Sequence, residues 1–165
     1  MVVVLMGVCG CGKTTVGRMV AEALGWPFLD ADDFHPAANV ARMRAGTALT
    51  DDDRWPWLDR LAAEMAAINA RGAHAVLACS ALKQSYRDRL ARAGDVRFFY
   101  LKGDRATIAP RLAARPGHYM PASLLDSQLA TLEEPADATV VDIRVPVAAQ
   151  VAAIRTQLDV TPRTP

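Results

Sequence analysis

Val2-Val3-Val4-Leu5-Met6 runs directly into Gly7-Val8-Cys9-Gly10-Cys11-Gly12-Lys13-Thr14-Thr15, and this stretch decides the fold. Its first five residues are apolar and mostly β-branched, which predicts a buried strand. The residues after them match Gly-x-x-x-x-Gly-Lys-Thr, a phosphate-binding loop that requires a strand before it and a helix after it. Helical spacing of apolar residues follows at Val16, Met19, Val20, Ala23 and Leu24. The pattern therefore has the context that it needs.

The chemistry of phosphate binding explains the residue types of this loop. Gly7, Gly10 and Gly12 allow backbone amides to turn toward phosphate oxygens, and the helix directs its unpaired N–H groups at the same anion. We expect the Lys13 ammonium to contact the β- and γ-phosphates and the Thr14 hydroxyl to ligate Mg²⁺. A glycine-rich turn before an ordinary helix is the alternative, and it explains fewer positions. The expected nucleotide-binding residues are Gly7, Val8, Cys9, Gly10, Cys11, Gly12, Lys13, Thr14 and Thr15.

Length and composition restrict the class of protein. A chain of 165 residues fits one domain that is large enough for a core of its own. Its net charge of +1 gives no reason to expect a nucleic-acid or membrane partner. The chain has three cysteines, two of them in the loop, which is typical of a reducing compartment, and no run approaches the roughly 20 apolar residues of a membrane span. We therefore expect a cytoplasmic protein.

The rest of the chain alternates between strand-like and helical segments, which predicts an α/β fold. Continuous apolar runs indicate strands that are buried on both faces of a parallel sheet, with the ligand crevice at their carboxyl ends. The expected strands are Val2–Met6, Pro27–Leu29, Ala75–Cys79, Val96–Leu101 and Thr139–Ile143. The expected helices are Lys13–Leu24, Trp57–Arg71, Lys83–Ala93 and Val147–Leu158. We predict a three-layer fold of the phosphate-loop class, with a five-stranded parallel sheet flanked by helices.

Two stretches interrupt this alternation and are too long and polar to be simple connections. We interpret residues 30–54 as a substrate-binding insertion that contains a short helix. We interpret residues 111–122 as a mobile lid, followed by a helix around Ser123–Leu132. Residues 1–158 then form a single domain, and residues 159–165, which include two prolines, form a frayed tail.

Three carboxylates follow the second expected strand. The exit of this strand is expected beside the phosphate loop, so Asp30 and Asp32, two residues apart in an extended segment, would face the bound phosphates. We predict that Asp32 is the general base for an acceptor hydroxyl and that Asp30 lies in the water shell of Mg²⁺. A solvated acidic turn that caps the next helix is the alternative, and we favour it for Asp33.

Cationic residues near the crevice are candidates for binding an anionic acceptor. Arg54 follows Asp51–Asp53, which we interpret as signals for the start of a helix, and its guanidinium could grip a carboxylate. Lys83 and Arg87, with Tyr86, stand one helical turn apart after the third strand and form either an anion clamp or a solvated surface.

The expected lid carries cations of its own. Arg111 and Arg115 would neutralise charge during phosphoryl transfer, so we assign them catalytic roles together with Lys13 and Asp32. His118 could contact substrate or cap a helix, and the sequence leaves both interpretations open.

Several segments together resemble the thermoresistant gluconokinases over most of the chain, from Val4 to about Val151. Besides the phosphate loop, the resemblance rests on Phe28-Leu29-Asp30-x-Asp32, His35-Pro36, Asp53-Arg54-x-Pro56-Trp57-Leu58, Cys79-Ser80-Ala81-Leu82-Lys83-x-x-Tyr86-Arg87-Asp88, His118 and Gln128. It implies ATP-dependent phosphorylation of D-gluconate at its 6-hydroxyl, on a fold similar to shikimate kinase and often as a homodimer. It also implies substrate contacts for Asp32, His35, Arg54, Lys83, Arg87 and His118.

Other classes of protein share this phosphate loop, and two residues of the loop depart from the family pattern. Shikimate kinase or another small-metabolite kinase is the second interpretation, whereas a switch GTPase is disfavoured because the chain has no Asp-x-x-Gly and no Asn-Lys-x-Asp. Cys9 and Cys11 stand where the family commonly has serine. A thiol at a helix N-terminus ionises more readily, so an oxidation-sensitive loop is one hypothesis and a pair of inert structural thiols is the other.

Overall fold

The computed structural model describes residues 1–45, 47–114 and 122–158. The strands in this part of the chain are β1 (Val2–Met6), β2 (Phe28–Asp30), β3 (Ala75–Ala78), β4 (Val96–Lys102) and β5 (Thr139–Asp142). The helices are α1 (Lys13–Leu24), the 3₁₀ turn η1 (Ala31–Phe34), α2 (Ala37–Arg44), α3 (Asp51–Ala70), α4 (Gln84–Ala91), α5 (Arg105–Ala113), α6 (Ala122–Thr131) and α7 (Val147–Leu158).

The five strands form one parallel sheet in the order β2-β3-β1-β4-β5. At the centre of the sheet, Val3 of β1 lies opposite Val76 of β3 and Arg97 of β4. All five residues of β1 are fully buried, as its apolar sequence predicts for a strand covered on both faces. The predicted α/β fold is thereby confirmed.

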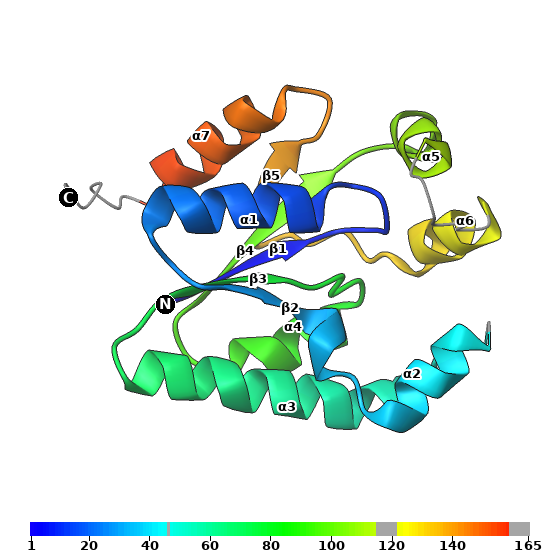
Figure 1. Cartoon of the computed structure of the whole chain (residues 1–165), viewed down its shortest axis with the longest axis horizontal. Helices are drawn as coiled ribbons and strands as arrows, with labels where there is room; N and C mark the ends of the chain where they lie inside the picture. Colours follow the sequence, from blue (N-terminus) through cyan, green and yellow to red (C-terminus); the bar gives the residue numbers. More distant parts are fainter. Residues whose placement is uncertain (46, 115–121, 159–165) are drawn as a thin grey trace.

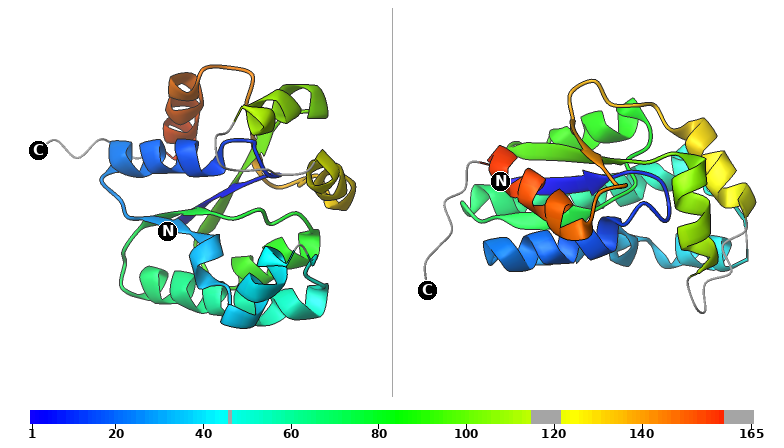
Figure 2. Two further views of the ribbon diagram at one scale, coloured as in Figure 1. Left: turned by 45° about the vertical axis from the view of Figure 1, so that its right-hand side comes forward. Right: turned by 90° about the horizontal axis from the view of Figure 1, so that it is seen from above.

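Helices cover both faces of the sheet and give a three-layer arrangement. Helices α1 and α7 lie on one face, and α3 and α4 lie on the other (Figures 1 and 2). Alternate residues of β1 enter two different cores, with Val3 and Leu5 on the α1 side and Val2 and Val4 on the α3 side. Helices α2, α5 and α6 lie beyond the carboxyl ends of the strands, where ligands bind in folds of this kind (Figure 1).

The start of α3 differs from the prediction. The helix begins at Asp51, six residues before the expected Trp57, because Thr50 forms a capping box with Asp53. The Thr50 hydroxyl accepts the Asp53 N–H, and the Asp53 carboxylate accepts the Thr50 N–H. Asp51–Asp53, interpreted as helix-start signals, form the first turn, and Pro56 lies inside the helix.

The segment that leads into the expected lid also differs from the prediction, because it forms a helix that was not expected. Residues Arg105–Ala113 form α5, which begins where the Asp104 carboxylate accepts the Thr107 N–H and contains Pro110. Arg111 therefore belongs to a helix. The later part of the expected lid, residues 115–121, and the tail, residues 159–165, lie outside the described residues. Within the described residues no helix is long and apolar enough to span a membrane.

Candidate functional site

The phosphate loop joins β1 to α1 at the carboxyl edge of the sheet, and its glycines permit backbone angles that other residues rarely adopt. Gly7, Gly10 and Gly12 have φ angles of 141°, 78° and 103°, a region that side chains of L-residues rarely adopt. A Cβ atom on Gly10 would lie 2.6 Å from Cγ of Leu112, so the loop packs closely against α5. The loop therefore depends on glycine in two ways: glycine adopts these φ angles without strain, and at position 10 it leaves the space that Leu112 occupies.

Lys13 lies across the loop from which it projects. Its Nζ donates hydrogen bonds to the backbone oxygens of Gly7 and Val8, each over 2.9 Å. The same Nζ lies 4.0 Å from Sγ of Cys11. The loop therefore holds the ammonium group beside the amides that would bind phosphate.

Thr14 and Asp30 lie together although β1, which precedes the loop of Thr14, is not a neighbour of β2, which ends at Asp30. Strand β3 separates β2 from β1, but the first turn of α1 carries Thr14 to the end of β2. The Thr14 hydroxyl donates to Oδ2 of Asp30 over 3.3 Å. A hydroxyl and a carboxylate are hard oxygen donors of the kind that Mg²⁺ shares with nucleotide phosphates, so these residues fit the cation.

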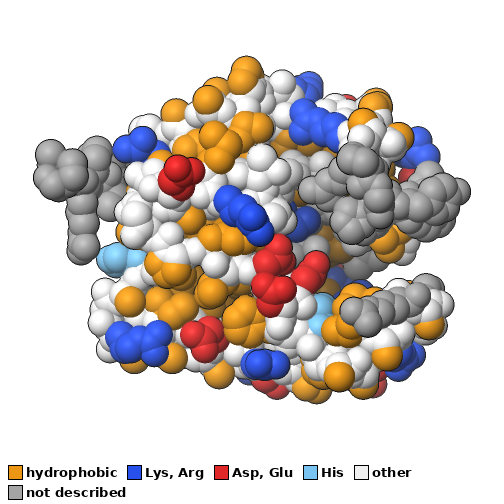
Figure 3. Space-filling view, viewed as in Figure 1, with side chains coloured by type: hydrophobic (Ala, Val, Ile, Leu, Met, Phe, Trp, Pro, Cys, Tyr) orange, Lys and Arg blue, Asp and Glu red, His pale blue; other side chains and the backbone are white. Residues whose placement is uncertain are grey.

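Asp32 lies in a turn, which corrects the expectation of an extended segment. Strand β2 ends at Asp30, and the Asp30 side chain caps η1 by accepting the Asp32 N–H over 3.2 Å. The Asp32 side chain is 87% exposed. Partial desolvation by the surrounding protein, followed by the negative charge of Asp30, raises the pKa of Asp32. Acidic side chains gather near the centre of this face, with a histidine beside them (Figure 3).

Trp57 supports the turn that carries Asp32. Its Nε1–H donates to the backbone oxygen of Ala31 over 2.8 Å, and its ring stacks on His35 with centroids 4.2 Å apart. His35 Nε2 lies 4.0 Å from Oδ1 of Asp32, and burial lowers the pKa of His35. The sequence indicated His35, but nothing in its pattern indicated that Trp57 would position η1.

Arg54 and Lys83, two of the expected acceptor cations, meet at the carboxylate of Asp51, which the sequence indicates only as part of a helix start. Lys83 Nζ lies 2.7 Å from Oδ2 of Asp51, and the Tyr86 hydroxyl donates to its Oδ1. Arg54 Nη1 lies 3.9 Å from the same Oδ1 and 3.3 Å from the Tyr86 hydroxyl. Residues from the starts of α3 and α4 thus form one polar cluster.

Arg87 does not join this cluster, because Lys83 precedes α4 as its N-cap and the two residues do not share a helix face. Arg87 is only 2% exposed. Its guanidinium donates to the backbone oxygens of Ala81 and Leu82 and to the side chain of Gln84. Ala81 has a φ of 44°, so Arg87 stabilises a strained connection between β3 and α4.

The expected lid residues have different outcomes. Arg111, in the last turn of α5, donates from Nη2 to the backbone oxygen of Ile143 over 2.8 Å and so connects α5 to the end of β5. Arg115 and His118 lie outside the described residues.

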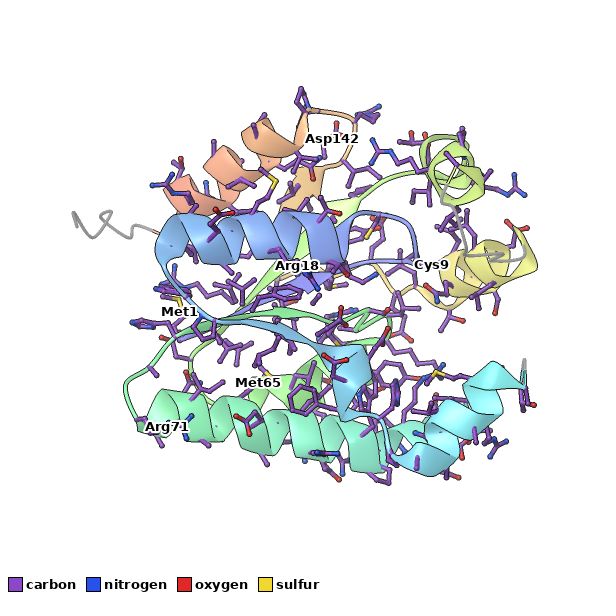
Figure 4. The ribbon with its side chains drawn as sticks, in the orientation of Figure 1. Met1, Cys9, Arg18, Met65, Arg71 and Asp142 are labelled. Carbon is purple, nitrogen blue, oxygen red and sulfur yellow. The ribbon has the colours of Figure 1, made fainter. Side chains whose placement is uncertain are left out.

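Gln128 of α6 contacts the phosphate loop directly. Its Oε1 accepts the backbone N–H of Cys9 over 2.7 Å, and Cys9 lies where the loop faces α6 (Figure 4). The resemblance included Gln128, but no role had been derived for it.

The thiols of the loop are enclosed by protein. Cys9 and Cys11 are 8% and 1% exposed. Burial raises the pKa of the Cys9 thiol, although the positive charge of Lys13 acts in the opposite direction. This environment favours the inert form of Cys9 over a reactive thiolate.

Comparison with known proteins places this geometry among small-molecule kinases. Residues 2–135 match a family model described as an AAA domain. A gluconokinase from Gluconobacter oxydans is 50% identical over 137 residues, covering 81% of this chain and 76% of that protein.

Solved structures agree with the sequence comparison. A sugar kinase from Janibacter has a TM-score of 0.90 at 47% identity and covers 98% of this chain and 95% of its own. A gluconokinase from Sinorhizobium meliloti has a TM-score of 0.82 at 42% identity, covering 94% of both chains. A shikimate kinase from Bacteroides thetaiotaomicron, at 17% identity and a TM-score of 0.70, covering 97% of this chain and 99% of its own, shares the fold alone.

Proposed function

The chain belongs to the gluconokinase family, and from this premise we propose that it transfers the terminal phosphoryl group of ATP to D-gluconate, giving 6-phospho-D-gluconate. The observation that carries the proposal is the contact of Thr14 in the phosphate loop with Asp30, two residues before the exposed Asp32. This contact brings a site for a nucleotide and its cation beside a candidate base.

The donor half would work through backbone amides and one ammonium group. Residues 7–15 bind the phosphates of ATP, and Lys13 reaches from the loop toward the transferred group. Thr14 and Asp30 would hold Mg²⁺, which neutralises phosphate charge when it is bound. Arg111 and Arg115 are proposed to add positive charge near the same phosphates.

Asp32 is proposed as the general base in the acceptor half. Oxygen 6 of gluconate forms a bond to the γ-phosphorus while the bond from that phosphorus to the β–γ bridging oxygen breaks, which leaves ADP. Asp32 takes the proton of the 6-hydroxyl, a role that requires its ionised carboxylate. His35 lies next to Asp32 and is proposed to contact the acceptor.

The carboxylate of gluconate requires cations at the far end of the same site. Arg54 and Lys83 are proposed to bind it, because both reach one carboxylate already and each side chain is 30% exposed. Arg87 is proposed to act on substrate through the connection that it holds. The proposed contact from His118 remains a prediction.

Assays with single acceptors test the proposed reaction. ADP release should depend on D-gluconate and should be far slower with shikimate or with other sugar acids. No turnover with gluconate would contradict the proposal, and preferred turnover of shikimate would identify the alternative kinase. A cytoplasmic location and a homodimer, also proposed, are tested by fractionation of the source cells and by light scattering of the purified protein.

A further inference from the structure

The Asp51 carboxylate lies beside Arg54 and Lys83, where the acceptor carboxylate is proposed to bind. We propose that Asp51 is a specificity-determining residue that lowers the charge of this site, so that it selects acceptors with one negative charge at this end over those with two. The inference rests on the proposed function, because Arg54 and Lys83 are acceptor cations only under that function.

The contacts of Asp51 are those that a substrate carboxylate would make. One oxygen is 2.7 Å from the Lys83 ammonium, and the other accepts the Tyr86 hydroxyl and lies 3.9 Å from Arg54. Hydrogen bonds from Lys83 and then from Tyr86 lower the pKa of Asp51, so its carboxylate is charged at neutral pH. The Asp51 side chain is 41% exposed, so a bound acid can reach the cations beside it.

The charges of the cluster decide which acid fits. Arg54 and Lys83 contribute two positive charges and Asp51 removes one, which leaves one positive charge for the ligand. The neighbouring Asp53 does not alter this balance, because its carboxylate lies 2.9 Å from Arg42. One carboxylate neutralises the site, whereas a second one would be left without a cation.

A competition experiment with paired inhibitors tests this role. Glycerate and tartronate share a three-carbon skeleton with a central hydroxyl, but glycerate carries one carboxylate and tartronate carries two. Their inhibition constants are measured against gluconate at saturating ATP for the wild type and for Asp51→Asn. We expect Asp51→Asn to lower the ratio of the tartronate constant to the glycerate constant about fivefold, the effect of one partly exposed charge.

Two variants separate this effect from a purely structural one. Asp51→Glu retains the charge and should retain the wild-type ratio. Asp59→Asn breaks another α3–α4 ion pair, between Asp59 and Arg89, outside the cluster. It should leave the ratio unchanged even if it lowers stability.

The outcomes distinguish this inference from the proposed function. An unchanged ratio in Asp51→Asn, with gluconate turnover retained by the wild type, overturns the inference alone. The absence of wild-type gluconate turnover overturns the proposed function. In that case calorimetric titration of tartronate and glycerate tests whether Asp51 sets the charge preference of the cluster for bound acids: a fivefold fall in the ratio supports this preference and an unchanged value overturns it.

Discussion

The proposed donor and acceptor halves of the site are built in different ways. Most of the proposed donor half is one continuous segment, from the buried strand β1 through the loop to Lys13 and Thr14, and this segment presents mainly backbone groups of the loop. The acceptor half consists of side chains from η1, the start of α3 and the start of α4. A local pattern can therefore specify the donor half, whereas the acceptor half exists only after the layers have packed.

This difference implies that substitutions in the two halves should fail in different ways. The largest expected effect comes from a pair of variants. Asp32→Asn removes the proposed base and should lower kcat by about 10²- to 10⁴-fold while ATP affinity stays nearly unchanged. Lys13→Ala should instead weaken ATP binding, because the ammonium lies beside the phosphate-binding amides.

Turnover by ADP release and ATP affinity by calorimetry distinguish these two variants. Thermal unfolding controls for misfolding. Retention of most of the rate in Asp32→Asn would show that the base assignment is wrong. Equal loss of ATP affinity in both variants would remove the proposed separation of the halves.

A second prediction concerns the dependence of the donor half on glycine. Gly10→Ala combines a positive φ with a Cβ only 2.6 Å from Leu112, whereas Gly25→Ala combines a positive φ with open space. Gly25→Ala should cost about 1 to 2 kcal/mol of unfolding free energy. Gly10→Ala should cost about 1 to 3 kcal/mol more because the Leu112 side chain of α5 must shift in a packed core. Urea denaturation measures both, and equal costs would contradict the close packing of the loop against α5.

A third prediction concerns the packing that supports the acceptor half. Trp57→Phe keeps a ring for stacking on His35 but leaves the Ala31 oxygen without its donor. The free energy of unfolding should fall by about 1 to 3 kcal/mol. Because η1 carries Asp32, kcat should also fall while the KM for ATP stays unchanged. Steady-state kinetics with urea denaturation check it. An increase in the KM for ATP alone would show that Trp57 acts on the donor half.

The smallest expected effect is a shift in a titration. Because the pKa of Asp32 is raised, the rate should fall on the acid side at a pH above the ordinary aspartate value of about 3.9. The negative charge of Asp30 contributes to this shift, so Asp30→Asn should lower the pKa of Asp32. Carbon NMR of the Asp32 carboxyl group in the ligand-free protein measures this directly. An unchanged pKa would exclude coupling of the two carboxylates.

The same pKa shift has a consequence for stability. A carboxyl group whose pKa is raised in the folded state binds its proton more tightly there than in the unfolded chain. Ionisation of Asp32 therefore costs stability as the pH rises through its pKa. Asp32→Asn should unfold at a slightly higher temperature than the wild type at pH 7, and differential scanning calorimetry measures this. An equal or lower unfolding temperature would contradict the raised pKa.

Sequence patterns predicted the segments whose structure depends on their own residues. The bounds of α1 and α7 match the prediction because apolar spacing continues through each helix. Helix α5 was not predicted, although the Asp104 carboxylate caps its start; Pro110, which lies inside it, is a residue that helix interiors rarely contain. The predicted bounds began α3 at Trp57, whereas the helix starts at Asp51, where Asp51–Asp53 were interpreted as helix-start signals and where Thr50 forms the capping box.

The acceptor half shows why the remaining site residues could not be predicted. The position of Asp51 at a helix start is enough to explain why an aspartate stands there. Its contacts with Lys83 and Tyr86, more than 30 residues away, arise only from the packing of α3 against α4. The spacing of Lys83 and Arg87 indicated a shared helix face, but Lys83 precedes the helix and Arg87 is buried. Residue types and spacing made Asp32 and the cations candidates, and the family resemblance strengthened their assignment to an acceptor.

The hydrogen bond from Cys9 to Gln128 connects occupancy of the loop to a distant part of the chain. One backbone N–H makes one strong hydrogen bond, so a phosphate oxygen at Cys9 and the Gln128 side chain are mutually exclusive partners. Under the proposed function, a phosphate oxygen that takes the Cys9 N–H would displace Gln128 and remove this restraint on α6. A nucleotide phosphate bound at Cys9 would therefore loosen the attachment of α6, 119 residues further along the chain, before any acceptor has bound.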